Sequence, residues 1–277
     1  MNVVGIDIGG TKTSIGVVDI RKGNLLSKII IPSKKYKDDK KNLDNIIYNT
    51  IKIIGNQKII NIGIGVPELI NNEGIIKGNY NFNWNNKNLT NFFPSKYKVI
   101  VDSDVRCHLR AEKFYGHGKK LNNFIYVNIG TGLSYSHFKN YKIYSGANGY
   151  AIHFASSKIT LYNPLNNNKM SLIPEDFYSG KAIFKFLKKF KESKKQNIIL
   201  NNIADSLASL IGNLVNSIDP ELIIMGGGVV INNLKFRNLL IKNIPKYILS
   251  KDVKKIKILM SKLKDDTGLL GAAAVFK

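Results

Sequence analysis

An apolar strand that runs into a glycine turn occurs three times in this chain and limits the fold more than any other feature. The first copy is VVGIDIGGTKTSIGVVDI, residues 3–20, and NNFIYVNIGTGLSYSHFKN, residues 122–140, repeats its pattern. The third is PELIIMGGGVV, residues 220–230. Because strand, glycine turn and strand recur in both halves, the sequence predicts two lobes related by an internal duplication.

The order of the hydrophobic patterns predicts an α/β fold that opens with an antiparallel meander. The predicted strands are 3–10, 13–20, 24–32, 59–67, 98–104, two within 122–140, and one within 220–230. The predicted helices are 43–55, 105–116, 202–219, 235–248 and 269–277. We also predict a loop at residues 162–171 in the second lobe.

Length and composition predict a soluble globular protein with a substantial core. The chain has 277 residues, of which 44% are hydrophobic and 22% charged. We find no apolar run near the ~20 residues of a membrane-spanning helix, and the start MNVVGIDIGG enters a strand without a secretory signal. The single cysteine, Cys107, excludes an internal disulfide and a cysteine-rich zinc site. We therefore expect a cytoplasmic protein without structural zinc and without a membrane partner.

A formal net charge of +23 raises the question of a nucleic-acid partner. The lysines accompany abundant Asn and Ile along the whole chain, and no basic stripe is interleaved with aromatic residues. Nucleic-acid binding is therefore disfavoured, although the charge would attract polyanionic ligands.

The three glycine turns have the composition of phosphate-binding turns. Glycines let backbone N–H groups approach a phosphate, threonine adds a hydroxyl and lysine adds a charge. The candidates are Gly9, Gly10, Thr11 and Lys12 in the first turn, Gly130, Thr131 and Gly132 in the second, and Gly226 and Gly227, suited to an adenosine, in the third. Asp7 at the first strand end is a candidate magnesium ligand, which we expect to act through water. One such turn alone would be ordinary turn chemistry, but three after apolar strands favour a nucleotide site.

The chain resembles the ROK family of sugar kinases, within the hexokinase, actin and Hsp70 ATPase superfamily. The motifs that carry the resemblance are DIGGTK (7–12), GIGVP (63–67), DSDV (102–105), IGTG (129–132), GANG (146–149), SGKAI (179–183), IIMGGGV (223–229) and DDTGLLGAAA (265–274). The resemblance implies a two-lobed actin-like ATPase (ribonuclease H-like) fold, with duplicated mixed β-sheets flanked by helices and a cleft between the lobes. We expect a small lobe at 1–105, joined by a C-terminal helix at 267–277, and a large lobe at 106–266. Family repressors carry an added N-terminal DNA-binding domain, and a start at the first strand disfavours that branch.

The family resemblance places the catalytic base at Asp104. The family motif Glu-Asn-Asp-x-Asn becomes Asp102-Ser103-Asp104-Val105-Arg106, so Ser103 replaces an asparagine that contacts the sugar. Asp104 could instead cap the helix that follows, but a cap does not explain the surrounding motif. Arg106 either neutralises charge in the transition state or pairs with Asp102, and we favour pairing.

The resemblance also implies a sugar pocket with altered residues. Asn148 and Gly149 belong to the family's Gly-Ala-x-Gly sequence. In the Glu-x-Gly-His run that normally follows, His153 replaces the glutamate and Ser156 the histidine, and the family's zinc cysteines are absent. Either these two residues hydrogen-bond a sugar, or the segment is a strand or short helix that fills the core.

Four further residues complete the predicted pocket. Glu175 matches the family's second sugar carboxylate, although a glutamate at a helix start is also an ordinary feature. Asn81 and Trp84 resemble an asparagine and a tryptophan that border the sugar. Glu68 replaces a glycine, and with Asp104 and Glu175 it raises the hypothesis of an amino sugar.

The sequence thus predicts a glucokinase-like enzyme that phosphorylates a hydroxyl of a hexose or hexose derivative, with ATP and Mg²⁺ as cofactors and Asp104 as general base. The alternative is a non-catalytic sensor, or pseudokinase, that binds a nucleotide or a sugar. The resemblance further suggests a homodimer. The sugar and the hydroxyl stay open.

Overall fold

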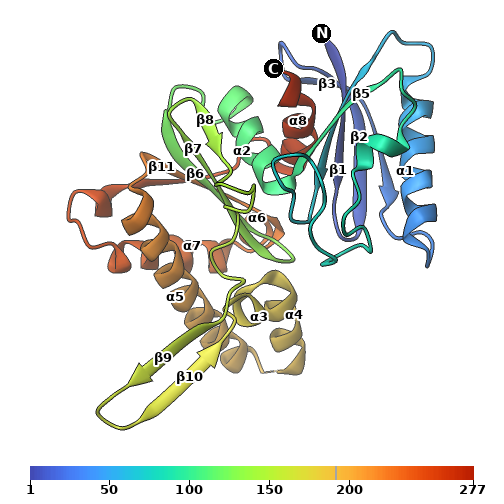
Figure 1. Cartoon of the computed structure of the whole chain (residues 1–277). Helices are drawn as coiled ribbons and strands as arrows, with labels where there is room; N and C mark the ends of the chain where they lie inside the picture. The colour runs from blue at the N-terminus through green and yellow to red at the C-terminus, as the bar shows by residue number, and fades with distance from the viewer. Residues whose placement is uncertain (191) are drawn as a thin grey trace. The chain divides into compact units, whose positions relative to one another are not determined.

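The computed structural model of the chain describes residues 1–190 and 192–277, which form two compact units (Figure 1). Unit 1 comprises Met1–Asn122, Ser136–Ile152 and Ser261–Lys277, and unit 2 comprises Asn123–Tyr135 and His153–Met260. Unit 1 extends past the predicted lobe boundary at residue 105, because helix α2 (Asp104–Tyr115) packs against helix α8 (Thr267–Ala273).

Unit 1 is built on a mixed five-stranded sheet with the order β3-β2-β1-β4-β5. Its strands are β1 (Asn2–Ile8), β2 (Lys12–Asp19), β3 (Asn24–Pro32), β4 (Asn61–Val66) and β5 (Lys98–Ser103). The meander β1-β2-β3 is antiparallel, whereas β1, β4 and β5 run parallel. The parallel strands end at the same edge of the sheet, and this edge carries the predicted carboxylates.

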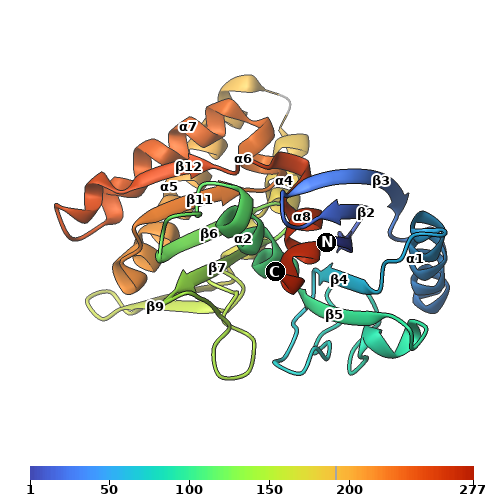
Figure 2. The ribbon, with the colours of Figure 1, turned by 90° about the horizontal axis from the view of Figure 1, so that it is seen from above.

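Helices cover both faces of this sheet. Helix α1 (Asp39–Ile54) lies on one face and α8 on the other (Figure 2). Helix α8 approaches the strands closely because glycines line its path. A Cβ atom at Gly63 of β4 would lie 1.9 Å from the Ala272 carbonyl oxygen, and one at Gly271 would lie 1.7 Å from the Cys107 carbonyl oxygen of α2. Glycine at these positions therefore fixes α8 between the sheet and α2.

Unit 2 contains a parallel ladder in the order β12-β11-β6, formed by β6 (Asn123–Ile129), β11 (Leu222–Gly226) and β12 (Lys257–Met260). Strands β7 (Leu133–Lys139) and β8 (Lys142–Tyr144) form an antiparallel hairpin, of which residues from Ser136 onward are assigned to unit 1. The remaining helices are α3 (Glu175–Tyr178), α4 (Gly180–Lys189), α5 (Ser193–Ile218), α6 (Gly228–Asn232) and α7 (Leu234–Asn243). Short 3₁₀ helices are η1 (Leu89–Phe92), η2 (Ile244–Tyr247), η3 (Val253–Lys255), η4 (Lys264–Asp266) and η5 (Ala274–Phe276). Mixed β-structure flanked by helices confirms the predicted α/β class.

Helix α5 corrects our expectation that no long apolar segment is present. By length and composition alone, its 26 residues could cross a membrane. However, Leu207, Ile211 and Val215 are fully buried in the core of unit 2, where α7 packs against the helix. The apolar face of α5 therefore packs inside unit 2, as the apolar face of a core helix does in a globular domain.

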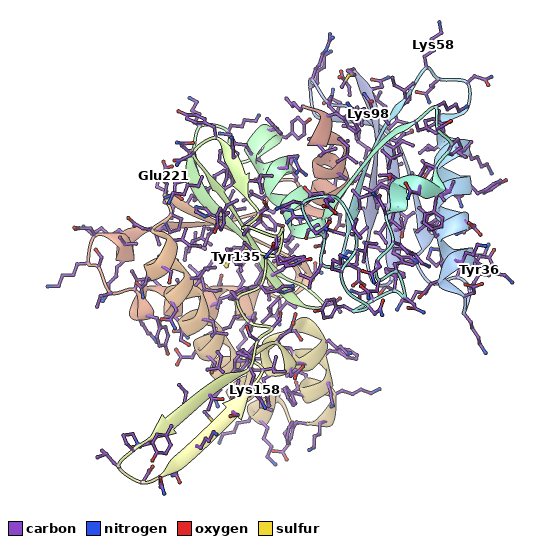
Figure 3. All side chains as sticks on the ribbon, viewed as in Figure 1. Tyr36, Lys58, Lys98, Tyr135, Lys158 and Glu221 are labelled. Carbon is purple, nitrogen blue, oxygen red and sulfur yellow. The ribbon has the colours of Figure 1, made fainter. Side chains whose placement is uncertain are left out.

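The segment predicted as a loop at 162–171 is largely a β-hairpin, formed by β9 (Ile159–Asn163) and β10 (Asn168–Leu172). The hairpin projects from the rest of unit 2 in Figure 1, and Figure 3 labels Lys158 where it begins. Leu161 pairs with Met170 across the strands, and both side chains are more than half exposed. The prediction was wrong because the Asn and Pro residues of the turn masked the short flanking strands.

Candidate functional site

Asp104 lies where strand β5 meets helix α2, at the carboxyl end of the parallel strands. It is the first residue of the helix, and the N-cap residue Ser103 makes no side-chain capping bond. The Asp104 Oδ1 atom accepts hydrogen bonds from the Val105 amide at 2.6 Å and the Ser103 hydroxyl at 3.4 Å. Both of these hydrogen bonds are made by Oδ1.

Asp104 and Asp7 form an acidic pair with unusual protonation properties. Burial raises the pKa of Asp104 from 3.8 to about 6; the Asp7 charge also raises it, and His108 opposes the rise. Burial likewise raises the pKa of Asp7, against the lowering effects of His108, Lys12 and Lys28. A carboxylate with a pKa near 6 is ionised at neutral pH and is a stronger proton acceptor than an ordinary aspartate.

The Asp7 carboxylate lies over a glycine of helix α8. A Cβ atom at Gly268 would be 2.4 Å from the carboxylate, so only glycine leaves this space open. Gly268 lies in the DDTGLLGAAA motif at 265–274, and we predicted no role for it from the sequence. Glycine lowers the stability of a helix. A glycine in the first turn of a predicted helix therefore indicated that a close contact requires it there.

The first glycine turn joins β1 to β2 in unit 1. The Gly9 amide donates a hydrogen bond to the Lys12 carbonyl oxygen at 2.9 Å, while Thr11 is exposed. A Cβ atom at Gly10 would lie 3.1 Å from Oδ1 of Asn81. The turn and the predicted sugar asparagine are therefore neighbours.

Glu68 organises the loop that carries Asn81. Its carboxylate is 3% exposed and accepts three backbone hydrogen bonds, from the amides of Tyr80, Asn81 and Phe82, at 2.9, 2.6 and 3.0 Å. Asn81 in turn donates to the Pro67 carbonyl oxygen at 2.7 Å. Both oxygens of Glu68 are occupied by the protein itself, which removes the observation behind the amino-sugar hypothesis.

Trp84 belongs to the core of unit 1 and not to an open pocket wall. Its side chain is fully buried, and its ring stacks on Phe82 with centroids 4.2 Å apart. The indole N–H donates to the Asp39 carbonyl oxygen at 3.3 Å. Trp84 therefore stabilises the loop that carries Asn81 by packing in the core of unit 1.

Asp102 forms a buried ion pair with two arginines of α2. Nε of Arg106 lies 2.5 Å from Oδ1, and Arg110 binds Oδ2. Burial acts to raise the pKa of Asp102, but the two guanidinium groups outweigh it and the pKa is lowered. Arg106 also donates to the carbonyl oxygens of Gly149, at 2.6 Å, and Ile70, at 3.4 Å. The pairing that we favoured for Arg106 is present in the structure.

Asn148 and Gly149 lie in a loop held against residues 70–72. Gly149 has φ +88°, and a Cβ atom there would lie 2.5 Å from the Ile70 carbonyl oxygen. The side chain of Asn72 donates to the Ala147 carbonyl oxygen at 2.8 Å. Gly149 is buried, whereas Asn148 is exposed and free to meet a ligand.

In unit 2, His153 and Ser156 hydrogen-bond each other, with Nδ1 and Oγ 3.1 Å apart. The segment around them is irregular and His153 is exposed, so it is neither the strand nor the short helix of our core-filling alternative. Desolvation lowers the pKa of His153, and the Glu175 carboxylate opposes this effect. Glu175 accepts the Leu133 amide at 2.6 Å through Oε1. The three predicted pocket residues are therefore neighbours beside the second glycine turn.

The second and third glycine turns come together within unit 2. The Gly180 amide donates to the Gly130 carbonyl oxygen at 2.8 Å, and the Lys181 amide to that of Thr131 at 3.4 Å. Gly227 has φ +94°, and a Cβ atom there would lie 2.3 Å from the Ile129 carbonyl oxygen. Gly180 and Lys181 lie in the SGKAI motif at 179–183, and we predicted no role for them from the sequence.

The predicted site residues divide between the two units. Unit 1 holds Asp7, Gly9, Gly10, Thr11, Lys12, Glu68, Asn81, Ser103, Asp104, Asn148 and Gly149, and unit 2 holds Gly130, Thr131, Gly132, His153, Ser156, Glu175, Gly226 and Gly227. Within the described ranges 1–190 and 192–277, no three His, Cys, Asp or Glu residues gather into a metal cluster. A surface hollow beside α1, lined by Tyr36 and its neighbours (Figure 3), contains none of the predicted residues.

Comparison with known proteins gives matches over nearly the whole chain. The model of the ROK family matches residues 3–277. A glucokinase of Thermotoga maritima is 23% identical, over 100% of this chain and 98% of that protein. A xylose repressor of Caldicellulosiruptor bescii is 24% identical, over 99% of this chain and 77% of the repressor. The crystal structure of a ROK family glucokinase from Streptomyces griseus, in complex with glucose and AMPPNP, has a TM-score of 0.85 at 20% identity and covers 99% of both chains.

Proposed function

The chain belongs to the ROK family, and on this basis we propose that it is an ATP-dependent kinase acting on a hydroxyl of a hexose or hexose derivative. The observation that carries the proposal is the desolvated Asp104 carboxylate at the end of the parallel strands, beside Asp7. If Asp104 only capped helix α2, the fold would not need a second carboxylate, that of Asp7, at this edge of the sheet. The resemblance to glucokinases supports the sugar as acceptor.

Asp104 acts as the general base. Its carboxylate accepts the proton of the sugar hydroxyl as the hydroxyl oxygen bonds to the γ-phosphorus and the bond to the β-γ bridging oxygen breaks. The products are a sugar phosphate, ADP and one proton. With a pKa of about 6, Asp104 is mostly ionised at neutral pH and ready to accept that proton.

The glycine turns bind phosphate groups of the nucleotide through their backbone amides. A divalent cation suits the chemistry beside Asp7, because this carboxylate is desolvated next to the second carboxylate of Asp104. Mg²⁺ bound there would neutralise phosphate charge. Asp7 would hold the cation through water, and Lys12 would add positive charge.

Sugar recognition is shared among short polar side chains. Asn81, Ser103 and Asn148 contribute from unit 1, with Gly149 shaping the loop. His153, Ser156 and Glu175 contribute from unit 2, where the His153–Ser156 pair takes the place of the family's Glu-x-Gly-His run. Glu68 acts indirectly, by holding the amide of Asn81 in place.

A non-catalytic sensor is the second candidate. The observation that favours it is the mutual hydrogen bond of His153 and Ser156, which uses polar atoms that a sugar would otherwise engage. The similarity to a xylose repressor agrees with such a role. The two candidates share the fold and differ in turnover.

ADP release separates the two candidates. We would measure it with Mg²⁺ and ATP over hexoses, N-acetylhexosamines and amino sugars, for the wild type and for Asp104→Asn, with Asp176→Asn as a control at the start of α3. A kinase turns over at least one sugar, keeps that activity in the control and loses it in Asp104→Asn. ATP and sugar binding without turnover of any sugar would favour the sensor and reject the kinase.

A further inference from the structure

We propose that Arg106 is a positioning residue that holds the sugar-side loops of unit 1 at a fixed place relative to the base Asp104. The loops are residues 70–72 and 145–149. This inference rests on the proposed kinase function, because it assigns the loops to sugar binding. Its structural part, the bracing of the two loops by one guanidinium group, concerns contacts within unit 1 alone.

All three nitrogens of the Arg106 guanidinium are engaged by the protein. Nε binds Asp102 at 2.5 Å, Nη1 donates to the Gly149 carbonyl oxygen at 2.6 Å, and Nη2 donates to the Ile70 carbonyl oxygen at 3.4 Å. The residue is 5% exposed. A buried guanidinium committed to a carboxylate and two carbonyl groups joins three chain segments, and it has little freedom to meet a phosphate.

The two loops also contact each other at the point where Arg106 joins them. Gly149 packs against the Ile70 carbonyl, where a side chain would clash. The Asn72 side chain donates to the Ala147 carbonyl oxygen at 2.8 Å, and the Ser145 hydroxyl lies 3.3 Å from Oδ1 of Asn72. Arg106 therefore anchors a small assembly of two loops and not a single strand of chain.

Helix α2 connects this assembly to the reacting groups. Asp104 and Arg106 both lie in the first turn of α2, two residues apart. The position of that turn therefore sets both the base and the backbone beside Asn148. A misplacement of about 1 Å between reacting groups can cost roughly 10²-fold in rate. The buried guanidinium group of Arg106 thus fixes the distance between the sugar-side loops and the base Asp104.

Arg110 provides a matched control on the same helix. It lies one turn further along α2 and binds the other oxygen of Asp102. Its further contacts are to Cys107 and to the Gly271 carbonyl oxygen, and not to the two loops. Loss of either arginine unpairs part of Asp102, but only loss of Arg106 releases residues 70–72 and 145–149.

The test compares Arg106→Gln, Arg106→Lys and Arg110→Gln with the wild type. Steady-state kinetics would give KM for the sugar, KM for ATP and kcat, and amide hydrogen exchange would follow the segments 68–74 and 145–150. We expect Arg106→Gln to raise the sugar KM at least tenfold, to leave the ATP KM within about threefold, and to speed exchange in both segments. Arg106→Lys, which keeps the charge but has a single donor nitrogen, should recover part of each effect.

Equal effects in Arg106→Gln and Arg110→Gln on the sugar KM and on exchange would overturn the inference, since the role of Arg106 would then be that of the ion pair alone. If Arg106→Gln does not fold, the same comparison is made between Arg106→Lys and Arg110→Lys. If the wild type turns over no sugar, the proposed function fails, while the exchange data still decide whether Arg106 braces the loops.

Discussion

Replacing Asp104 by asparagine should make unit 1 more stable while abolishing turnover. Burial raises the pKa of this carboxyl group from 3.8 to about 6. A raised pKa means that the folded protein favours the protonated form, so ionised Asp104 destabilises the fold. A difference of roughly two pKa units, at 1.36 kcal/mol each, corresponds to about 3 kcal/mol.

The sign and the pH window follow from the two pKa values. Below about pH 4 the group is protonated in both the folded and the unfolded chain, and the penalty is absent. The penalty grows as the pH rises toward 6 and is complete above it. The Asp104→Asn variant should thus gain about half of the 3 kcal/mol at pH 5 and all of it at pH 8.

Urea denaturation at pH 5 and pH 8 in magnesium-free buffer would measure this gain. Trp84 is the chain's only tryptophan and is fully buried in unit 1, so its fluorescence reports the unfolding of that unit. Asp102→Asn is the matched control, and we expect it to lower the free energy of unfolding. It leaves Arg106 and Arg110 without their carboxylate, which typically costs about 3–5 kcal/mol at both pH values.

A less stable Asp104→Asn variant at pH 8, or a gain that does not change between pH 5 and pH 8, would refute this reasoning. Either result would mean that water reaches the carboxylate as freely in the folded chain as in the unfolded one. The basis for a base with a raised pKa would then be lost, whatever the activity of the variant.

Three more outcomes follow from the site. The kcat/KM for the sugar should fall tenfold per pH unit below about pH 6 and level off above it, as Asp104 titrates; a flat profile down to pH 5 would argue against this base. Gly268→Ala places a methyl group 2.4 Å from the Asp7 carboxylate and should reduce kcat/KM for Mg-ATP at least tenfold, whereas Gly228→Ala, with its nearest atom at 3.7 Å, should change it little. Glu68→Gln weakens the acceptor of three amides and should cost about 1–3 kcal/mol in a denaturation assay. It should also raise KM for neutral and amino sugars alike, and an effect on amino sugars only would restore Glu68 as a direct ligand.

Local patterns were enough to predict the turns and the place of Asp104. Glycine after an apolar strand leaves few alternatives for the backbone, and a carboxylate between a strand pattern and a helix pattern must lie at the sheet edge. The pairing of Arg106 with Asp102 was predicted, but the role of Glu68 and the loop contacts of Arg106 were beyond such patterns. The partners in those contacts are backbone groups, and a backbone N–H or C=O carries no signature in the sequence.

The β9–β10 hairpin shows the opposite difficulty. Its strands alternate apolar and polar residues, but each has only five residues, and the asparagines between them dominate the composition of the segment. Helix α5 was predicted in part, as the helix at 202–219, but its apolar length was missed for a related reason. We judged apolar runs by continuity, whereas the polar residues of α5 interrupt the run without breaking the helix.

The place of α8 has a consequence for the order of events during synthesis. Strands β1 and β4, and the glycines that receive α8, leave the ribosome early, but the helix that covers them is made roughly 145 residues after the first segment of unit 1 is complete. At typical elongation rates this takes roughly 7–30 s. During that interval the nascent chain presents an apolar sheet face to the cell, so translation pauses within unit 2 should lower the yield of native protein more than pauses after α8.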